Sequence, residues 1–419
     1  MKILFYQHQY PAFGGIETVT TTLANAFAED GHQVAIVSLI HKNGTDLLQR
    51  LHPNVVWHEL PEPNCDSEAN CQALGRMLDA FCPDHILFQD SYANIQGILF
   101  RAVAAWRERH GWARETTTGM CVAEHSMPRL SLGRRQVPLS PIEIAKRFVL
   151  LVLRPYLLWS RFRYESRRRK EIFDHVDAYV VLSKNYRRRI LELVGKNRLA
   201  KLHVIPNMID AASGDLALSY KKKQILFVGS LIGTKGVDRL LDAWRELCER
   251  YVDWEFVIVG DGVERSALER IVAKRKIRGV RFEGFYCDVS DYYLCASIFV
   301  MASDFEGWPM ALGESMRQGC VPVVYDSFAA ARDIIDDGVN GRVVRHFVKR
   351  AFVAALNELM EDGELRHQMA QAAHEKAALY SVERVKKEWY ALFDSTDEGG
   401  GLIAVEHNAP WQPLGVRWA

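Results

Sequence analysis

The chain has 419 residues, which at about 150 residues per domain suits two or three domains. Hydrophobic residues make up 48% and charged residues 25%, an ordinary composition for a globular protein. The formal net charge of +1 excludes a chain built as a whole to coat nucleic acid, so any basic surface must be local. Eight cysteines form neither a Cys-x-x-Cys pair nor a zinc-like cluster, and we interpret them as buried, reduced thiols of a cytosolic protein.

The sequence favours a cytoplasmic protein without a transmembrane helix. The apolar run at residues 3–6 is too short for the core of a signal peptide. The longest apolar stretch, residues 148–159, is interrupted by Arg154 and Pro155, whereas a membrane-spanning helix needs roughly 20 apolar residues.

Short apolar runs alternate with helical patterns through the first half of the chain. A strand at residues 2–6 is followed by a Gly14-Gly15 turn and a helix over residues 16–30, whose apolar residues recur at helical spacing. Further strands are predicted at 33–38, 55–58, 85–88, 120–123 and 179–182. This alternation predicts a parallel sheet covered by helices on both faces.

The alternation breaks in the polar stretch 206–220 and then restarts. Strands are predicted at 224–228, 255–259, 280–283, 298–301, 321–324 and 342–344, and a helix at 237–251. The predicted fold class is therefore α/β, with two doubly wound, Rossmann-like domains at 1–207 and 208–382. Residues 348–393 are expected to be helical throughout, with a helix at 383–394 returning to the first domain. The sequence leaves open whether residues 395–419 are ordered.

The segment Ser303–Gly319 carries the most informative side chains. It follows a predicted strand and therefore lies at the carboxyl edge of the second sheet, where open parallel sheets bind ligands. Pro309 suits the first turn of a helix, and the free N–H groups of that turn would favour a phosphate. Glu306 precedes this helix and Glu314 lies more than a turn inside it. The two carboxylates can therefore accept hydrogen bonds from different hydroxyls of one extended ligand.

This segment resembles the donor motif of the retaining GT-B glycosyltransferases of family 4, in which two glutamates separated by seven residues flank a Gly-aromatic-Pro turn. Further motifs resemble those of the family in order and spacing: residues 14–17, 205–210, 228–230 with Lys235-Gly236, 260–262 and 337–341. The resemblance covers most of the chain. It implies the GT-B architecture, with an acceptor-side N-terminal domain and a nucleotide-sugar-binding C-terminal domain.

The resemblance also implies roles for single residues. Glu306, Lys235 and His125 would be catalytic: Glu306 would contact donor-sugar hydroxyls, Lys235 would neutralise the departing diphosphate, and His125 would lie near donor sugar and acceptor. Glu314 would bind the ribose hydroxyls. The other expected donor-binding residues are Gly15, Ser230, Gly307, Trp308, Pro309 and Met310.

One position departs from the family pattern, and some alternatives stay open. Ser230 stands where many family members carry Arg, which weakens the diphosphate clamp; Arg332 or Arg265 could supply the missing charge. Residues 260–262 could be a structural turn and His125 a structural histidine. A nucleotide-sugar 2-epimerase and a non-catalytic binding protein share the architecture. A dehydrogenase is disfavoured, because no Gly-x-Gly-x-x-Gly follows the first strand.

Residues 129–170 form an unusually basic segment, with twelve Arg and Lys against Glu143 and Glu165. With the apolar run at 148–159, this composition is typical of a cationic amphipathic helix on a membrane surface; the alternative is a helix packed on the sheet with a solvated basic face. Taken together, the sequence and the resemblance predict transfer of a hexose from a nucleotide sugar, with UDP expected, to a lipid-linked or cell-surface glycan such as lipopolysaccharide. The expected enzyme retains anomeric configuration, needs no metal or cofactor, binds no nucleic acid, and lies peripherally on the cytoplasmic face of the membrane.

Overall fold

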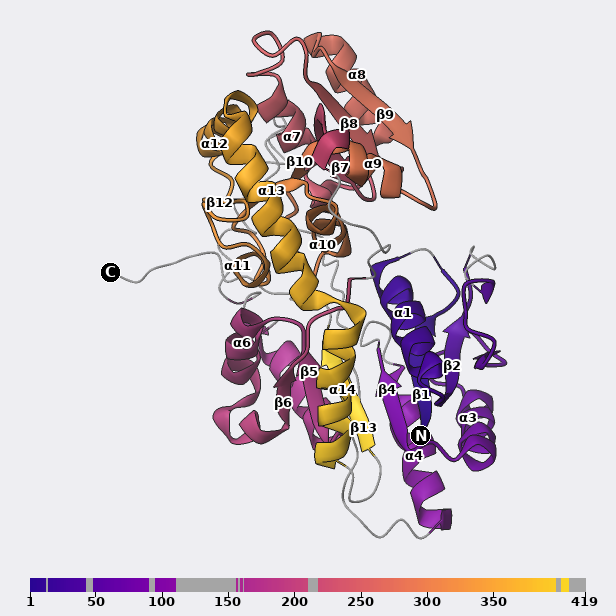
Figure 1. Cartoon of the computed structure of the whole chain (residues 1–419). Coiled ribbons are helices and arrows are strands. Elements are labelled where there is room, and N and C mark those ends of the chain that lie inside the picture. The colour runs from indigo at the N-terminus through magenta and orange to yellow at the C-terminus, as the bar shows by residue number, and fades with distance from the viewer. Residues whose placement is uncertain are drawn as a thin grey trace.

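The computed structural model describes residues 1–12, 14–42, 48–89, 95–110, 156, 159–160, 162–209, 218–396 and 401–406. These residues form two α/β domains, each built around one parallel sheet (Figure 1). The predicted fold class, two Rossmann-like domains followed by C-terminal helices, is therefore confirmed.

The N-terminal sheet has seven strands in the order β3-β2-β1-β4-β13-β5-β6. Its strands are β1 Lys2–Gln9, β2 Gln33–Ile40, β3 Val55–Glu59, β4 His85–Phe88, β5 Ala178–Val181, β6 Leu202–Val204 and β13 Gly401–Glu406. The strands β1, β4 and β5 are almost wholly buried, as expected of parallel strands that are covered on both faces. The strand predicted at 120–123 lies outside the described residues.

The strand β13 was not anticipated, since the sequence left open whether residues 395–419 were ordered. Residues Gly401–Glu406 instead pair in parallel with both β4 and β5, with Gly401 opposite His85 and Ile403 opposite Ala178. The run Leu-Ile-Ala-Val within β13 is apolar and partly β-branched, which suits an interior parallel strand. Residues 407–419 lie outside the described part of the chain.

Helices cover the N-terminal sheet: α1 Gly15–Glu29, α3 Glu68–Phe81, α4 Gln96–His110 and α6 Lys184–Val194, with a 3-10 turn η1 Lys196–Lys201 and helical residues 162–175. The helix α1 buries Val19, Leu23 and Phe27, four residues apart, against the sheet. Serine side chains cap two of the helices: Ser67 accepts a hydrogen bond from the backbone of α3, and Ser183 does the same for α6.

The C-terminal sheet has the order β12-β11-β10-β7-β8-β9. Its strands are β7 Lys222–Val228, β8 Glu255–Val259, β9 Val280–Gly284, β10 Ala296–Met301, β11 Val321–Tyr325 and β12 Arg342–Val344. Its helices and 3-10 turns are η2 Leu218–Tyr220, η3 Gly233–Lys235, α7 Val237–Trp244, α8 Arg265–Arg275, α9 Ser290–Cys295, α10 Met310–Arg317, α11 Ala331–Ile334, α12 Lys349–Glu361, α13 Gly363–Ala377 and η4 Ala378–Tyr380. The helix predicted at 237–251 is shorter than expected, because after Trp244 the chain continues in turns closed by shorter-range hydrogen bonds such as Leu247 N–H to the Trp244 carbonyl.

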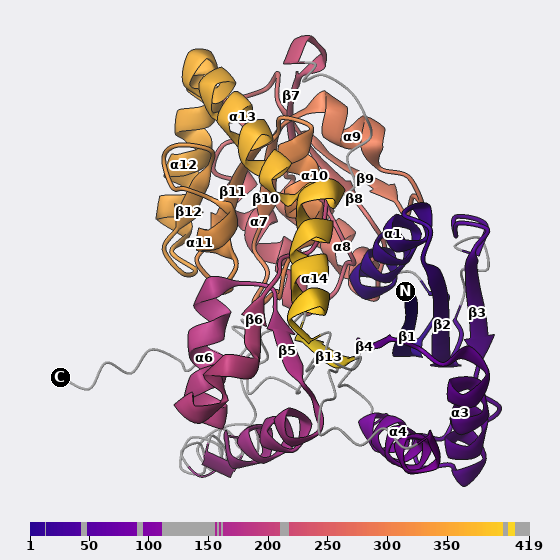
Figure 2. The same ribbon diagram turned by 60° about the horizontal axis from the view of Figure 1, so that its bottom comes forward.

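The last helix, α14 Val382–Thr396, leaves the C-terminal domain and lies along the N-terminal domain, as Figures 1 and 2 show. The Phe393 ring lies 5.6 Å from the Phe27 ring of α1, between centroids. At the end of α1, Asp30 accepts hydrogen bonds from Lys386 Nζ at 2.8 Å and from Tyr390 Oη at 2.5 Å. This helix therefore ties the two domains together covalently and by packing.

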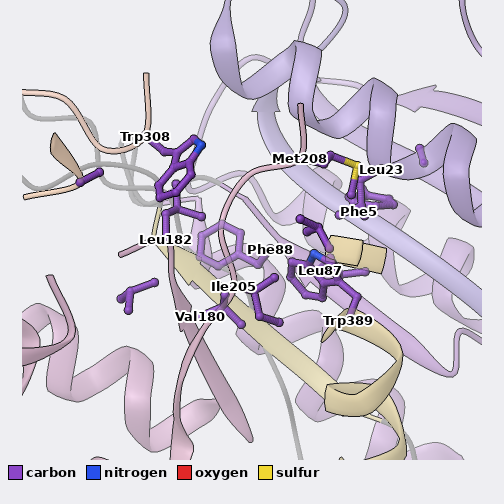
Figure 3. Packing of buried hydrophobic residues seen from close by; sticks show 14 of the residues in the cluster. Phe5, Leu23, Leu87, Phe88, Val180, Leu182, Ile205, Met208, Trp308 and Trp389 are labelled. Carbon is purple, nitrogen blue, oxygen red and sulfur yellow. The ribbon is translucent and has the colours of Figure 1, made fainter. Parts of the chain in front are cut away.

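The carboxyl ends of the two sheets face each other. Asn185, just after β5, donates from Nδ2 to Asp333 Oδ1 at 3.0 Å, and Asp333 follows β11 in the other domain. One buried hydrophobic cluster continues from one domain into the other, and Figure 3 shows Trp308 of the C-terminal domain beside Leu182 of the N-terminal domain. A ligand held at either edge is thus close to the other domain.

The described cysteines differ in their burial. Cys248 and Cys320 are buried, but Cys82 and Cys287 are exposed, so the prediction of buried thiols is wrong for those two. Within the described ranges, no helix combines the length and the apolar character needed to cross a bilayer.

Candidate active site

The loops after β7 and β10 meet at the carboxyl edge of the C-terminal sheet, because these two strands are neighbours. The backbone N–H of Asp304 donates to the Thr234 carbonyl at 2.8 Å and joins the two loops. Beside this bond, Lys235 Nζ donates to Glu306 Oε1 at 2.7 Å. The side chains of Lys235 and Glu306 are 27% and 12% exposed, so a cation and an anion stand side by side and still reach solvent. The structure therefore brings together two of the three residues expected to be catalytic.

A glycine is required directly after Lys235. Gly236 has φ +66°, in the left-handed region, and precedes the first residue of α7. A Cβ at this position would lie 2.3 Å from the Ala302 carbonyl oxygen. The close approach of these two backbones is what allows the Lys235 loop to pack beside the loop that carries Glu306.

A largely buried ion pair fixes the loop that carries Glu306. Arg239, on α7, donates from Nη2 to Asp304 Oδ1 at 2.6 Å and from Nη1 to the Ala302 carbonyl at 2.5 Å. The Asp304 side chain is fully buried, and the Arg239 guanidinium lies 4.1 Å from the centroid of the Phe347 ring. Burial lowers the pKa of Arg239 from its ordinary value. A desolvated pair of this kind fixes one loop geometry, because neither partner is easily released.

The helix α10 points its N-terminus toward the same edge. Its first residue is Met310, Pro309 is the N-cap, and no side chain caps the helix. Such an uncapped end carries partial positive charge and suits a phosphate. Glu314, in the second turn of α10, accepts a hydrogen bond from Tyr293 Oη at Oε2, at 2.9 Å.

The Trp308 side chain serves the interface between the domains. It is 6% exposed, and its ring contacts Tyr380 edge-to-face with centroids 4.8 Å apart. It also packs beside Leu182, as Figure 3 shows. Trp308 was expected to bind the donor. Because its side chain is packed at the interface between the domains, donor contact is left to the backbone between Gly307 and Met310.

The turn at residues 260–262 supports the loop that carries Ser230. Gly260 has φ +136°, and a Cβ there would lie 2.0 Å from the Gly229 carbonyl oxygen. The backbone N–H of Leu231 donates to the Asp261 carbonyl at 2.8 Å. These contacts favour the structural alternative for residues 260–262, while Ser230 itself is exposed.

The two arginines considered as replacements for the missing guanidinium are already engaged. Arg265 pairs with Asp261 and Glu269, at 3.2 and 2.9 Å. Arg332 pairs with Asp326 at 2.9 Å. A diphosphate would have to compete with these carboxylates for either guanidinium group.

Two of the expected site residues, Gly15 and His125, belong to the N-terminal domain. Gly15 is exposed as the first residue of α1, and a Cβ there would meet no atom within 4 Å. Next to it, the buried carboxylate of Glu17 accepts a hydrogen bond from Gln9 Nε2 at 2.8 Å. His125 lies outside the described residues. Within the described ranges, no three His, Cys, Asp or Glu side chains are grouped as a metal site.

The described part of the basic segment is divided between core and surface. Arg168 and Arg169 are buried, and Arg169 forms a salt bridge with the buried Glu165. The expectation that all basic residues of 129–170 face a membrane or solvent is therefore wrong for these two. They sit on the side of the 162–175 helix that packs against α6, where Ser166 Oγ donates to the Leu193 carbonyl at 2.6 Å.

Exposed aromatic and basic side chains lie on this helix and on the described residues just before it. We call this set of side chains the aromatic-basic face; it comprises Tyr156, Trp159, Arg163, Tyr164, Arg167 and Lys170. The Arg163 guanidinium lies 4.8 Å from the centroid of the Trp159 ring. Separately, a cavity of ≈ 530 Å³ is lined by Lys184, Arg187, Arg188, Leu191, Glu192, Lys196 and Leu199 of α6 and η1.

Three residues of the site escaped sequence reasoning: Arg239, Asp304 and Tyr293. Asp304 lies inside the segment that the sequence singled out, but its partner is 65 residues away. Arg239 follows Lys235 by one helical turn, which is a weak signal because basic residues are common on helix surfaces. For Tyr293 the sequence offers no signal, since its role depends on the packing of α9 against α10.

Two parallel α/β domains thus face each other, and the lysine-glutamate pair and the N-terminus of α10 lie at the edge between them. The model of the family "Glycosyl transferases group 1" matches residues 209–376, and that of "Glycosyltransferase Family 4" matches residues 13–213. The two matches run in sequence through both domains. The chain therefore belongs to the group 1 glycosyltransferases.

Named relatives agree with this assignment. The chain is 32% identical over 176 residues to the amylovoran biosynthesis glycosyltransferase AmsD of Erwinia amylovora, covering 42% of this chain and 49% of that protein. It is 21% identical over 376 residues to the lipopolysaccharide 1,6-galactosyltransferase of Salmonella typhimurium, covering 88% and 92%. The crystal structure of Anabaena HepE in complex with UDP superimposes with a TM-score of 0.67 at 17% identity, covering 94% and 100%. With AmsD, the match thus spans about half the length of the relative.

Proposed function

We propose that this protein transfers a hexose from a nucleotide sugar to a hydroxyl of a lipid-linked or cell-surface glycan, with retention of anomeric configuration. The observation that carries the proposal is the Lys235–Glu306 pair at the carboxyl edge of the second sheet. The names of AmsD and of the Salmonella galactosyltransferase support a polysaccharide or lipopolysaccharide acceptor. The HepE complex with UDP supports UDP as the nucleotide.

The geometry suggests how the residues divide the work. The Lys235 ammonium and the N–H groups at the start of α10 stabilise the charge that develops on the diphosphate as the glycosidic bond breaks. Glu306, 2.7 Å from Lys235, accepts a hydrogen bond from a donor-sugar hydroxyl and orients the sugar beside the diphosphate. Glu314 binds the ribose. Gly15 lets the N-terminal domain approach the diphosphate from the opposite side, and the role of His125 near the donor sugar and acceptor stays a prediction.

Metal independence follows from this division. Because a lysine and a helix N-terminus supply the positive charge, turnover of a nucleotide sugar should persist in EDTA at a rate within about twofold of the untreated enzyme. The measurement is release of nucleoside diphosphate from a panel of nucleotide sugars, by slow hydrolysis without acceptor. Loss of all turnover on chelation, restored by Mg²⁺ or Mn²⁺, would contradict this part of the proposal.

We also propose that the N-terminal domain binds the surface of an anionic membrane through the aromatic-basic face. Tyr156, Trp159 and Tyr164 are 63%, 52% and 52% exposed, an unusual amount for large aromatic side chains. Tyr and Trp favour the headgroup level of a bilayer, and each neighbouring basic residue adds roughly 1 kcal/mol near anionic lipid. The cavity lined by α6 and η1 is also mainly basic, with four cations, one carboxylate and two leucines. An acceptor held in that membrane would reach the acceptor-side domain.

The membrane proposal predicts separable losses of binding. Replacing Arg163, Arg167 and Lys170 together by Gln should lower the fraction bound to anionic vesicles at low salt at least about tenfold, because three of the interacting charges are removed. Trp159→Ser should lower the part of the binding that high salt leaves. Sedimentation with anionic and neutral vesicles at two salt concentrations measures both.

The matched control replaces Arg245, Arg270 and Lys274, which are exposed on the C-terminal domain, by Gln. This variant loses the same net charge, so vesicle binding close to that of the wild type is expected. Equal losses in both triple variants would mean that only net charge matters and would contradict the assignment to this face. The buried Arg168 and Arg169 are left unchanged, since replacing them would disturb folding.

A further inference from the structure

The hydroxyl group of Tyr293 is the buried partner of the Glu314 carboxylate. Tyr293 lies on α9, is 3% exposed, and donates from Oη to Glu314 Oε2 at 2.9 Å. Its ring contacts Phe299 of β10 edge-to-face, with centroids 6.3 Å apart. Burial, together with the nearby Glu314 charge, raises the pKa of Tyr293 well above its ordinary value, which favours the protonated phenol that donates this hydrogen bond.

The backbone of Tyr293 is held as firmly as its side chain. Lys221 Nζ donates to the carbonyls of Tyr293 and Ala296 at 2.8 and 2.7 Å. Cys320 Sγ donates to the same two carbonyls at 3.1 and 3.2 Å. These donors satisfy the carbonyls at the C-terminal end of α9, and the lysine charge also suits that end of a helix. The phenol is therefore presented to α10 from a fixed support.

A glutamate on the second turn of a helix normally samples several rotamers, and fixing it for a ligand costs conformational entropy. The bond from Tyr293 removes part of that freedom before a ligand arrives, and a hydrogen bond to the charged form also favours the carboxylate. We propose that Tyr293 is a positioning residue, which holds the Glu314 carboxylate ready for the ribose hydroxyls of the nucleotide. This inference rests on the proposed function, because it takes Glu314 as the ribose ligand.

The proposal has a consequence for ligand recognition that a purely structural tyrosine would not have. A carboxylate held in place for two hydroxyls should discriminate strongly against a nucleotide that lacks them. If Tyr293 acts through Glu314, removing its hydroxyl should weaken binding of the ribonucleotide and leave binding of the 2′,3′-dideoxynucleotide almost unchanged.

The experiment measures binding by calorimetry with the full chain. Wild-type protein is first titrated with the diphosphates of uridine, guanosine, adenosine and cytidine, and the tightest is carried forward with its 2′,3′-dideoxy counterpart. The variants are Tyr293→Phe, Glu314→Gln and the double variant. Tyr292→Phe is the matched control, because the adjacent Tyr292 donates instead to Glu283, at 3.2 Å.

For the ribonucleotide, Tyr293→Phe should raise the Kd about tenfold, the loss expected for a hydrogen bond to a charged group. For the dideoxynucleotide the change should stay below about twofold, and Tyr292→Phe should change neither value. In the Glu314→Gln background, Tyr293→Phe should add less than about twofold, since the residue through which it acts is already altered.

Several results would overturn the inference. An unchanged Kd in Tyr293→Phe would do so directly. An equally weakened binding of both nucleotides, or an undiminished effect in the Glu314→Gln background, would indicate a merely structural role. The inference would also fail if the wild-type protein bound none of the nucleotides, or if the Glu314→Gln variant bound them like the wild type. That last result would remove the proposed role of Glu314 itself, and it is seen without any Tyr293 variant.

Discussion

Replacing Glu306 by Ala should lower turnover of the donor nucleotide sugar at least about 100-fold, the loss typical when a residue that stabilises the transition state is removed. Glu306 is the carboxylate 2.7 Å from Lys235, so in the proposed site it would both contact the sugar and orient the lysine. Stability should change less than on loss of a fully buried carboxylate, because both side chains of this pair still reach solvent. The measurement is release of nucleoside diphosphate at saturating donor, with the urea midpoint as a check on folding.

Two further variants make this result specific. Glu306→Gln keeps the shape of the side chain, so a comparable loss of turnover would assign the effect to the charge. Glu269→Ala is the matched control, because Glu269 forms a surface ion pair with Arg265 at 2.9 Å. Near-normal turnover in Glu306→Ala would mean that the proposed site is wrong.

The largest effect on stability is expected from Asp304→Ala, which leaves Arg239 half-buried and without its ion-pair partner. Removing one partner of a buried ion pair typically costs about 3 kcal/mol, so the unfolding transition of the C-terminal domain should move to clearly lower urea. Donor binding should weaken as well, because the Asp304 side chain ties the loop of Glu306 to Arg239 of α7, the helix that follows the Lys235 loop. Tryptophan fluorescence follows the unfolding, since Trp244 and Trp254 are buried in this domain.

The control for Asp304 is Asp253→Ala. Asp253 pairs with Lys223 at 2.5 Å, but both side chains are more than half exposed. Removing a pair of this kind should change the free energy of unfolding by less than about 1 kcal/mol. Equal shifts in the two variants would contradict the view that burial makes the Arg239–Asp304 pair the support of the site.

Much of the fold could be predicted because buried parallel strands are continuous apolar runs. The strands at Glu255–Val259 and Arg342–Val344 begin and end where the sequence placed them. The helix after Pro309 could be predicted for a local reason, since proline favours the start of a helix. The carboxylates of Glu306 and Glu314 were found because they lie within one short segment at a strand end.

What escaped prediction depends on contacts between distant parts of the chain. The Arg239–Asp304 and Tyr293–Glu314 bonds depend on how β7, β9 and β10 are arranged in the sheet. The placement of β13 between β4 and β5 depends on strand pairing, which a short apolar run in a polar tail does not specify. Composition also treats all arginines of a basic segment alike, whereas the fold buries Arg169 against Glu165 and exposes Arg167.

The central claim is that this chain cleaves a nucleotide sugar at the glycosidic carbon and passes the sugar on. Time-resolved NMR of the wild-type protein with a panel of nucleotide sugars tests it most directly. We predict that one donor is consumed slowly, yielding its nucleoside diphosphate and a free sugar whose first-formed anomer has the configuration of the donor. Conversion of a nucleotide sugar into its 2-epimer would identify an epimerase instead, and a panel left intact under all conditions would contradict a catalytic role.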